Sequence, residues 1–103
     1  MNDVNFEWDE NKNKNKTNFI KHGITFEEAR TVFYDENAIL FDDPEHSSEE
    51  ERFIILGFSL TNKLCIVCHC YRDAEETIRL ISARKATKKE TDTYNKYLGG
   101  ELL

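Results

Sequence analysis

Several features that define common protein classes are scarce or missing in this sequence. It has one proline, four glycines and no apolar stretch longer than a few residues, which excludes a membrane-spanning helix of about 20 apolar residues. The first nine residues are polar and acidic, so we expect no secretory signal. The sequence contains no GxxxxGK or GxGxxG pattern and no pattern of an activated serine. A membrane protein, a nucleotide-binding enzyme of those classes and a serine hydrolase are therefore disfavoured.

What the sequence does contain is typical of a small folded domain. Hydrophobic residues make up 39% of the 103 residues and aromatic residues 12%, which is too much apolar material for a disordered chain. A chain of this length has room for one hydrophobic core. We therefore predict a single domain over residues 1–103.

The net charge of −6 argues against a nucleic-acid-binding protein, because phosphate contacts need Lys and Arg. The distribution of charge weakens that argument. Residues 12–30 and 79–103 each carry a net charge of +3, whereas residues 35–51 contain eight acidic residues and no basic one. We interpret the acidic residues at 42–51 as a solvated loop. The two basic segments would form one basic surface only if the fold brings them together.

Three cysteines, Cys65, Cys68 and Cys70, lie within six residues. An odd number of cysteines without a secretory signal indicates reduced thiols in the cytoplasm. The CxxC spacing and His69 suggest zinc, but the β-forming neighbours predict a strand, on which Cys65 and Cys68 point to opposite faces. No second pair of ligands follows. We therefore expect core side chains, no metal site and no cofactor.

Hydrophobic periodicity and capping motifs predict an α+β domain with the order β-α-α-β-β-β-β-α and a mainly antiparallel sheet packed by helices. The predicted strands lie at residues 4–8, 38–41, 52–58, 64–71 and 77–83. The third and fourth strands form a hairpin around residues 61–63. A first helix ends at Gly23, and capping boxes that start at Thr25 and Thr87 open two more helices, the last reaching about Tyr97.

Two of the predicted strands, at residues 53–56 and 64–67, are continuously apolar instead of alternating. Both faces of the sheet should therefore be covered. Two readings remain open for the second face. Either it is a contact surface for a partner protein, or the C-terminal helix packs over it.

The residues left to carry chemistry are mostly cationic. They are Lys21, His22, Arg52, Arg79, Arg84, Lys85, Lys88 and Lys89. Such a set suits RNA cleavage through the 2′-hydroxyl group, which needs a base, cations on the phosphorane and an acid at the 5′-oxygen. Arginine offers a fork of donors that matches phosphate oxygens. Each residue alone also has a structural explanation, as a surface cation or a helix cap.

Several motifs, taken in order, resemble the BrnT family of toxins. They are FEWD at residues 6–9, Asn18, KHG at residues 21–23, FEEA at residues 26–29, Arg52 with Gly57, ISARKATKKE at residues 81–90, and Tyr94. The resemblance covers nearly the whole chain. The sequence departs from the family pattern in one spacing and at one position. The spacing from Asp9 to Asn18 is longer than usual, and Thr91 stands where members commonly have Arg, which removes one potential phosphate contact.

The resemblance implies a fold like that of the RelE ribonucleases. It also implies the toxin of a type II toxin–antitoxin system, a metal-independent endoribonuclease that cleaves mRNA and inhibits growth. The implied partner is a cognate antitoxin, DNA-binding and BrnA-like, so that DNA is contacted only through the antitoxin. We expect a cytoplasmic location, and we leave a homodimer within the complex open.

Under this hypothesis Arg52 and Arg84 contact the phosphate and the transition state. Lys21 and His22 position RNA or exchange a proton, although His22 would equally fasten a helix end. The remaining cationic candidates are expected to bind the RNA; they are Arg79, Lys85, Lys88 and Lys89.

Two further catalytic candidates lie near the C-terminus. Glu90 either orients an arginine across the capping box or serves only as the cap. Tyr94 either stacks on a base or exchanges a proton, or it belongs to the core. The alternative to the whole hypothesis is a non-catalytic interaction module that docks a basic partner through its apolar sheet face and acidic loop. Toxicity of the chain expressed alone would support only the ribonuclease.

Overall fold

The computed structural model describes residues 4–43, 50–74 and 76–98, and it contains a five-stranded sheet with the order β1-β5-β4-β3-β2. The strands are β1 (Asn5–Glu7), β2 (Ile39–Asp42), β3 (Phe53–Phe58), β4 (Leu64–Arg72) and β5 (Thr77–Lys85). β1 pairs with β5 in parallel, and the other neighbouring strands are antiparallel. The predicted fold class is confirmed. Residues 44–49 of the predicted acidic loop lie outside the described residues.

The helices begin and end close to the predicted signals. They are η1 (Glu10–Lys12), α1 (Lys14–His22), α2 (Phe26–Ala29), η2 (Arg30–Tyr34) and α3 (Lys88–Leu98). Gly23 ends α1 in the left-handed conformation at φ 75°, and its N–H donates to the Phe19 carbonyl at 2.7 Å. The Thr25 hydroxyl accepts from the Glu28 N–H at 3.1 Å and opens α2. None of the described helices is long and apolar enough to cross a membrane.

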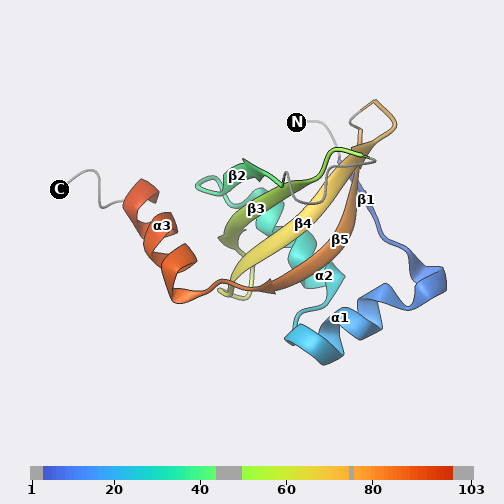
Figure 1. Ribbon diagram of the computed structural model, residues 1–103, viewed down its shortest axis with the longest axis horizontal. Helices are drawn as coiled ribbons and strands as arrows, with labels where there is room; N and C mark the ends of the chain where they lie inside the picture. The colour runs from blue at the N-terminus through green and yellow to red at the C-terminus, as the bar shows by residue number, and fades with distance from the viewer. Residues whose placement is uncertain (1–3, 44–49, 75, 99–103) are drawn as a thin grey trace.

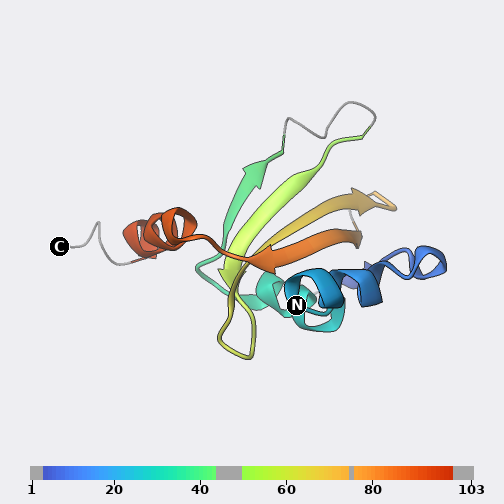
Figure 2. The same cartoon turned by 60° about the horizontal axis from the view of Figure 1, so that its bottom comes forward.

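One face of the sheet is packed by helices, and we call it the covered face. In Figure 1, α2 and η2 lie behind the sheet and α1 lies along its lower side, an arrangement that Figure 2 shows from another angle. The buried residues of this core are Ile24, Phe26, Ala29, Val32, Ile55, Cys65, Val67, Ile78, Leu80 and Ala83. Ile24 comes from the connection between α1 and α2, the next three residues come from the helices and the rest from the strands, so this face holds most of the apolar core.

The opposite face, which we call the open face, is covered at one end only. There Tyr94 of α3 packs on Leu56 and Ile66 in a second, smaller core. Both readings of the continuously apolar strands are therefore correct in part. α3 covers one end of the second face, and the rest of that face lacks a helix among the described residues.

The prediction that Cys65 and Cys68 of the CxxC motif point to opposite faces of the sheet is confirmed. Cys65 is buried in the core of the covered face, whereas Cys68 lines a hollow on the open face. Among the described residues, no group of three or more His, Cys, Asp and Glu side chains is arranged to hold a metal ion.

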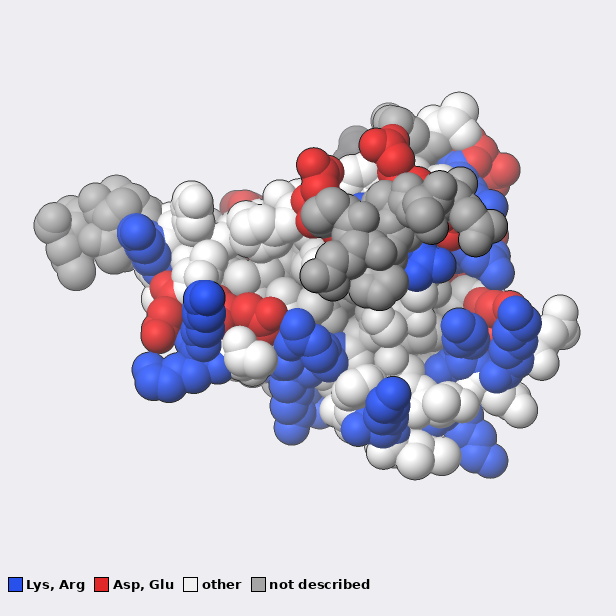
Figure 3. Space-filling view, viewed as in Figure 1, with Lys and Arg blue, Asp and Glu red and all other residues white. Residues whose placement is uncertain are grey.

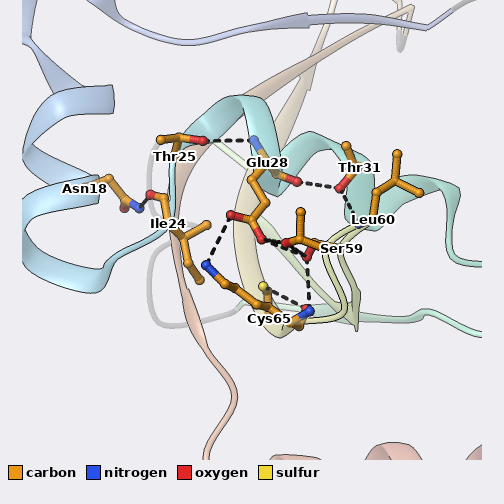
Figure 4. A network of polar contacts seen from close by, with 10 residues as sticks. Asn18, Ile24, Thr25, Glu28, Thr31, Ser59, Leu60 and Cys65 are labelled. Carbon is orange, nitrogen blue, oxygen red and sulfur yellow. Dashed lines mark hydrogen bonds and ion pairs between the residues drawn. The ribbon is translucent and has the colours of Figure 1, made fainter.

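A polar network ties α2 to the loop between β3 and β4 (Figure 4). The Glu28 carboxylate accepts hydrogen bonds from the hydroxyls of Ser59, at 2.9 Å, and Thr61, and it lies 3.6 Å from the Lys63 ammonium group. Partial burial would raise the pKa of Glu28, but these partners together lower it below its ordinary value. The Thr31 hydroxyl accepts from the Leu60 N–H at 3.0 Å. The network fixes the hairpin against the helices of the covered face.

Candidate active site

A hollow of about 290 Å³ lies on the open face, and we call it the open-face hollow. Its polar lining consists of His22, Asp43, Arg52, Cys68, Ser82 and Arg84. Its apolar lining consists of Ile54, Ile66, Ile81 and Ala83. His22 comes from the first basic segment and Arg84 from the second, so the fold brings the two segments together around Arg52.

A smaller hollow of about 100 Å³ shares Arg52 and Ile81 with the first and extends the basic surface. Lys12, Lys14 and Arg79 line it, together with the carboxylates Asp9 and Glu50. Figure 3 looks onto this side of the molecule. Most of the visible Lys and Arg side chains gather along its lower half, from α3 on the left to η1 and α1 on the right. A chain with a net charge of −6 thus presents a basic track across one face.

Arg84 is fixed by a bidentate pair with Glu90. Its two terminal nitrogens each lie 2.8 Å from one carboxylate oxygen. Glu90 also accepts the Thr87 N–H at 2.8 Å, so it both caps α3 and orients the arginine, the two roles left open by the sequence. The hydrogen bond from Arg84 lowers the pKa of Glu90 to about 2, and the same bond raises the pKa of Arg84.

The Arg84 side chain is 40% exposed, so Glu90 orients it without closing it off from a ligand. The pair uses one N–H of each terminal nitrogen. Nη1 also donates to the Lys85 carbonyl at 3.2 Å. The second N–H of the other terminal nitrogen and the Nε N–H are the donors that can turn to phosphate oxygens.

Asn18 holds the end of α1 against β5. Its amide donates to the carbonyls of Ile24 and Ala83 at 2.8 and 2.9 Å and accepts from the Ala83 N–H at 3.0 Å. Asn18 is buried, one helical turn before His22, and Ala83 directly precedes Arg84. Asn18 therefore sets the spacing between His22 and Arg84, a role that the sequence motif did not suggest.

Arg52 stands where β2 and β3 meet. Its Nε lies 3.7 Å from a Glu50 carboxylate oxygen, and its carbonyl accepts the Asp43 N–H at 2.9 Å. The strand pairing of β2 with β3 thus places Asp43 beside Arg52 at the rim of the hollow. The position of Arg52 is set by backbone pairing and not by a loop alone.

The other candidates from the sequence lie elsewhere. Lys21, Lys85, Lys88 and Lys89 are exposed and are not among the described residues that line the open-face hollow. Lys88 lies 3.5 Å from Asp92. Arg79 lines the smaller hollow and pairs with Glu7 at 2.5 Å.

Tyr94 is 2% exposed and donates to Asp35 at 2.7 Å. Burial together with Asp35 raises the pKa of Tyr94 to about 12, so its hydroxyl stays protonated. Its ring packs edge-on against Phe58, with ring centroids 5.3 Å apart. These contacts favour the core role, one of the two that the sequence left open for Tyr94.

Asp43, Lys12 and Lys14 line the hollows, and the sequence analysis did not name them as candidates. It assigned Asp43 to a solvated loop, an interpretation that is wrong for this residue because Asp43 is only 8% exposed and lines the open-face hollow. It named neither Lys12 nor Lys14 as a candidate, because they belong to an Asn-Lys repeat that resembles low complexity. The apolar run directly before residues 42 and 43 was the available signal that a strand end holds Asp43.

Comparisons with known proteins identify a family and a similar fold. A family model described as the ribonuclease toxin BrnT of type II toxin–antitoxin systems matches residues 8–90. Among solved structures, the Brucella abortus ribonuclease toxin BrnT has a similar fold, with a TM-score of 0.61 and 23% sequence identity. That match covers 84% of this chain and 100% of the Brucella chain. No curated protein matches the sequence.

Proposed function

The chain belongs to the BrnT family of ribonuclease toxins of type II toxin–antitoxin systems, and we propose that it is an endoribonuclease that cleaves mRNA without a metal ion. The observation that carries this proposal is the convergence of Arg52, Arg84 and His22 on the open-face hollow. Two guanidinium groups and an imidazole supply positive charge and a proton at one place. These are the requirements of cleavage through the 2′-hydroxyl group.

In the proposed reaction the 2′-oxygen attacks the adjacent phosphorus and the bond to the 5′-oxygen breaks. Arg52 and Arg84 bind the non-bridging oxygens, on which negative charge grows in the transition state. One such donor is worth about 10²- to 10³-fold in rate. His22 gives a proton to the leaving 5′-oxygen. The products carry a 2′,3′-cyclic phosphate and a 5′-hydroxyl group.

The basic track around the hollow binds the rest of the RNA strand. Arg79, Lys12 and Lys14 line the adjoining smaller hollow and contact phosphates on one side of the cleavage point. The exposed lysines contact RNA from outside the hollow; they are Lys21, Lys85, Lys88 and Lys89. Such contacts make binding depend strongly on salt, because each phosphate that is neutralised releases counterions.

Membership of the family implies an antitoxin partner. We propose that this partner is BrnA-like and DNA-binding, that it neutralises the toxin in the cytoplasm, and that this chain contacts DNA only through it. Without the antitoxin the chain inhibits growth by destroying mRNA. The mass of the complex in solution decides whether it contains two copies of this chain.

The experiment is expression of the chain alone in bacteria, followed by cleavage assays on purified protein. We expect growth arrest with the wild type and relief of arrest with Arg84→Ala, whose folded structure is retained. Lys96→Ala is the matched control, because it removes a cation from the far end of α3, outside both hollows. If wild-type protein leaves RNA uncut and Arg84→Ala is as toxic as the wild type, the ribonuclease proposal is wrong. The non-catalytic interaction module would then be the better hypothesis.

A further inference from the structure

The open-face hollow contains one carboxylate among its cationic groups. Asp43 is 8% exposed, and the thiol of Cys68 donates a weak hydrogen bond to it at 3.6 Å. Its backbone N–H is bound to the Arg52 carbonyl at 2.9 Å. Asp43 is therefore held by strand pairing beside Arg52, to which the proposed function assigns a phosphate contact. A carboxylate thus stands inside the proposed anion site.

We propose that Asp43 is the general base that accepts the proton of the 2′-hydroxyl group. This inference rests on the proposed ribonuclease function and adds the group that the reaction still lacks. Cleavage through the 2′-hydroxyl group needs a base and an acid, and His22 fills one role only.

The other described groups that line the hollow are poorly suited to accept this proton. Guanidinium groups stay protonated in proteins, which removes Arg52 and Arg84. Burial, followed by the charge of Asp43, raises the pKa of the Cys68 thiol to about 11, so Cys68 stays protonated near neutral pH. Ser82 has an ordinary hydroxyl group with no basic character.

One carboxyl group, that of Glu90, and one hydroxyl group, that of Tyr94, are hydrogen-bonded to other partners. Glu90 binds Arg84 through both oxygens and accepts the Thr87 N–H. Tyr94 is buried and donates to Asp35. Among the described lining residues, this leaves Asp43 and His22 as the groups that can exchange protons.

Their surroundings divide the two roles. An ionised carboxylate only accepts hydrogen bonds, and Asp43 lines the hollow together with Arg52 and Arg84. His22 lies in the last turn of α1. Unlike a carboxylate, an imidazole carries an N–H that it can donate. Asp43 is thus the base and His22 the acid.

These two groups account for both protons that move in the reaction. Asp43 takes the proton from the 2′-oxygen as the new oxygen–phosphorus bond forms. His22 gives its proton to the 5′-oxygen as the old bond breaks. Arg52 and Arg84 bind the phosphorane throughout. Exchange with water afterwards returns both side chains to their starting states.

The test compares Asp43→Asn with Asp42→Asn in single-turnover cleavage of a defined RNA. Asp42 is the exposed neighbouring carboxylate, so both variants change the charge equally. We expect Asp43→Asn to slow cleavage by about 10²- to 10⁴-fold and Asp42→Asn to cleave like the wild type. Asp43→Glu should recover part of the rate, because it restores the base at a shifted position. Asp43→Ser replaces Asp43→Asn if the latter does not fold.

A binding measurement separates a base from a residue that only positions Arg52. The probe is the same RNA with a 2′-deoxy sugar at the cleavage point, which binds but is not cut. We expect Asp43→Asn to bind this probe as tightly as the wild type or more tightly, because the change removes negative charge from a phosphate site. A loss of affinity as large as the loss of rate, without rescue by Asp43→Glu, would overturn the inference.

The remaining outcomes separate the inference from the proposed function. If wild-type protein does not cleave RNA, the proposed function fails and the inference fails with it. If the wild type cleaves and Asp43→Asn cleaves equally fast, only the inference is wrong. Thermal unfolding of each variant confirms that the rates refer to folded protein.

Discussion

The two faces of one sheet carry different tasks in this molecule. On the covered face, His69 is 0% exposed and its ring lies 4.8 Å from that of Phe33 and 5.3 Å from that of Tyr71. On the open face, the neighbouring residue Cys68 lines a hollow with charged groups at its rim. Successive residues of β4 thus serve stability and the candidate active site in turn. Mutations on the two faces should therefore affect different measurements.

The largest expected effect is on the covered face. Phe26 is fully buried and packs edge-on against Trp8, with ring centroids 5.6 Å apart. Phe26→Ala should lower the free energy of unfolding by about 3–5 kcal/mol, because it leaves a cavity in the main core. Chemical denaturation measures this. The control is Ile81→Ala, a partly exposed residue of the open-face hollow, which should cost clearly less. Equal losses of unfolding free energy in the two variants would contradict the view that the covered face contributes more to stability than the open face.

An intermediate effect is expected where the open face meets α3. Glu90→Gln removes the carboxylate that orients Arg84 and should slow RNA cleavage by about 10- to 100-fold, since a misplaced catalytic group loses rate steeply. The weaker cap should lower the free energy of unfolding by about 1 kcal/mol. Asp92→Asn is the control, because it breaks only the exposed pair with Lys88. A cleavage rate unchanged by Glu90→Gln would show that Glu90 serves α3 alone.

The smallest effect is a pH dependence of stability from the covered face. Burial lowers the pKa of His69 below its ordinary value of 6.5, so the unfolded chain binds the proton more readily than the folded protein. The stability from a neutral His69 is therefore complete above that value and is lost as the pH falls below it. Urea denaturation between about pH 7.5 and about pH 5 should show this fall.

Two variants identify the residue responsible for that fall. His69→Gln should abolish the pH dependence in this range, whereas His22→Gln on the open-face hollow should retain it. The opposite pattern would mean that the titrating histidine of the folded protein lies at the open-face hollow.

The stability contributed by Glu90, in its pair with Arg84, also falls as the pH is lowered, but in a more acidic range. With the pKa of Glu90 at about 2 against an ordinary 4.5, its contribution is complete above 4.5 and is lost toward about pH 2.

Local signals predicted the fold well because they act through neighbouring residues. The Thr87 hydroxyl accepts the Glu90 N–H at 3.2 Å, as the capping box requires, and Gly23 ends α1 in the left-handed conformation. The strands formed where apolar runs met turn residues. Such signals depend on a few consecutive positions and need no knowledge of the tertiary structure.

The candidate site was less predictable because it depends on contacts between distant segments. The charge of residues 35–51 suggested solvent, but the pairing of β2 with β3 buries Asp43 beside Arg52. The approach of His22 to Arg84 depends on Asn18, which bridges 65 positions to bind Ala83. No local pattern reports either contact. The residue types were visible in the sequence, whereas their convergence required the fold.

The central claim is that the open-face hollow cleaves RNA with its own cationic side chains. The most direct test is incubation of purified protein with a defined RNA in excess EDTA, followed by analysis of the product ends. We predict 2′,3′-cyclic phosphate and 5′-hydroxyl ends from the wild type, and no such products above background from Arg84→Ala. Cleavage that EDTA abolishes, or equal cleavage by Arg84→Ala, would contradict the account.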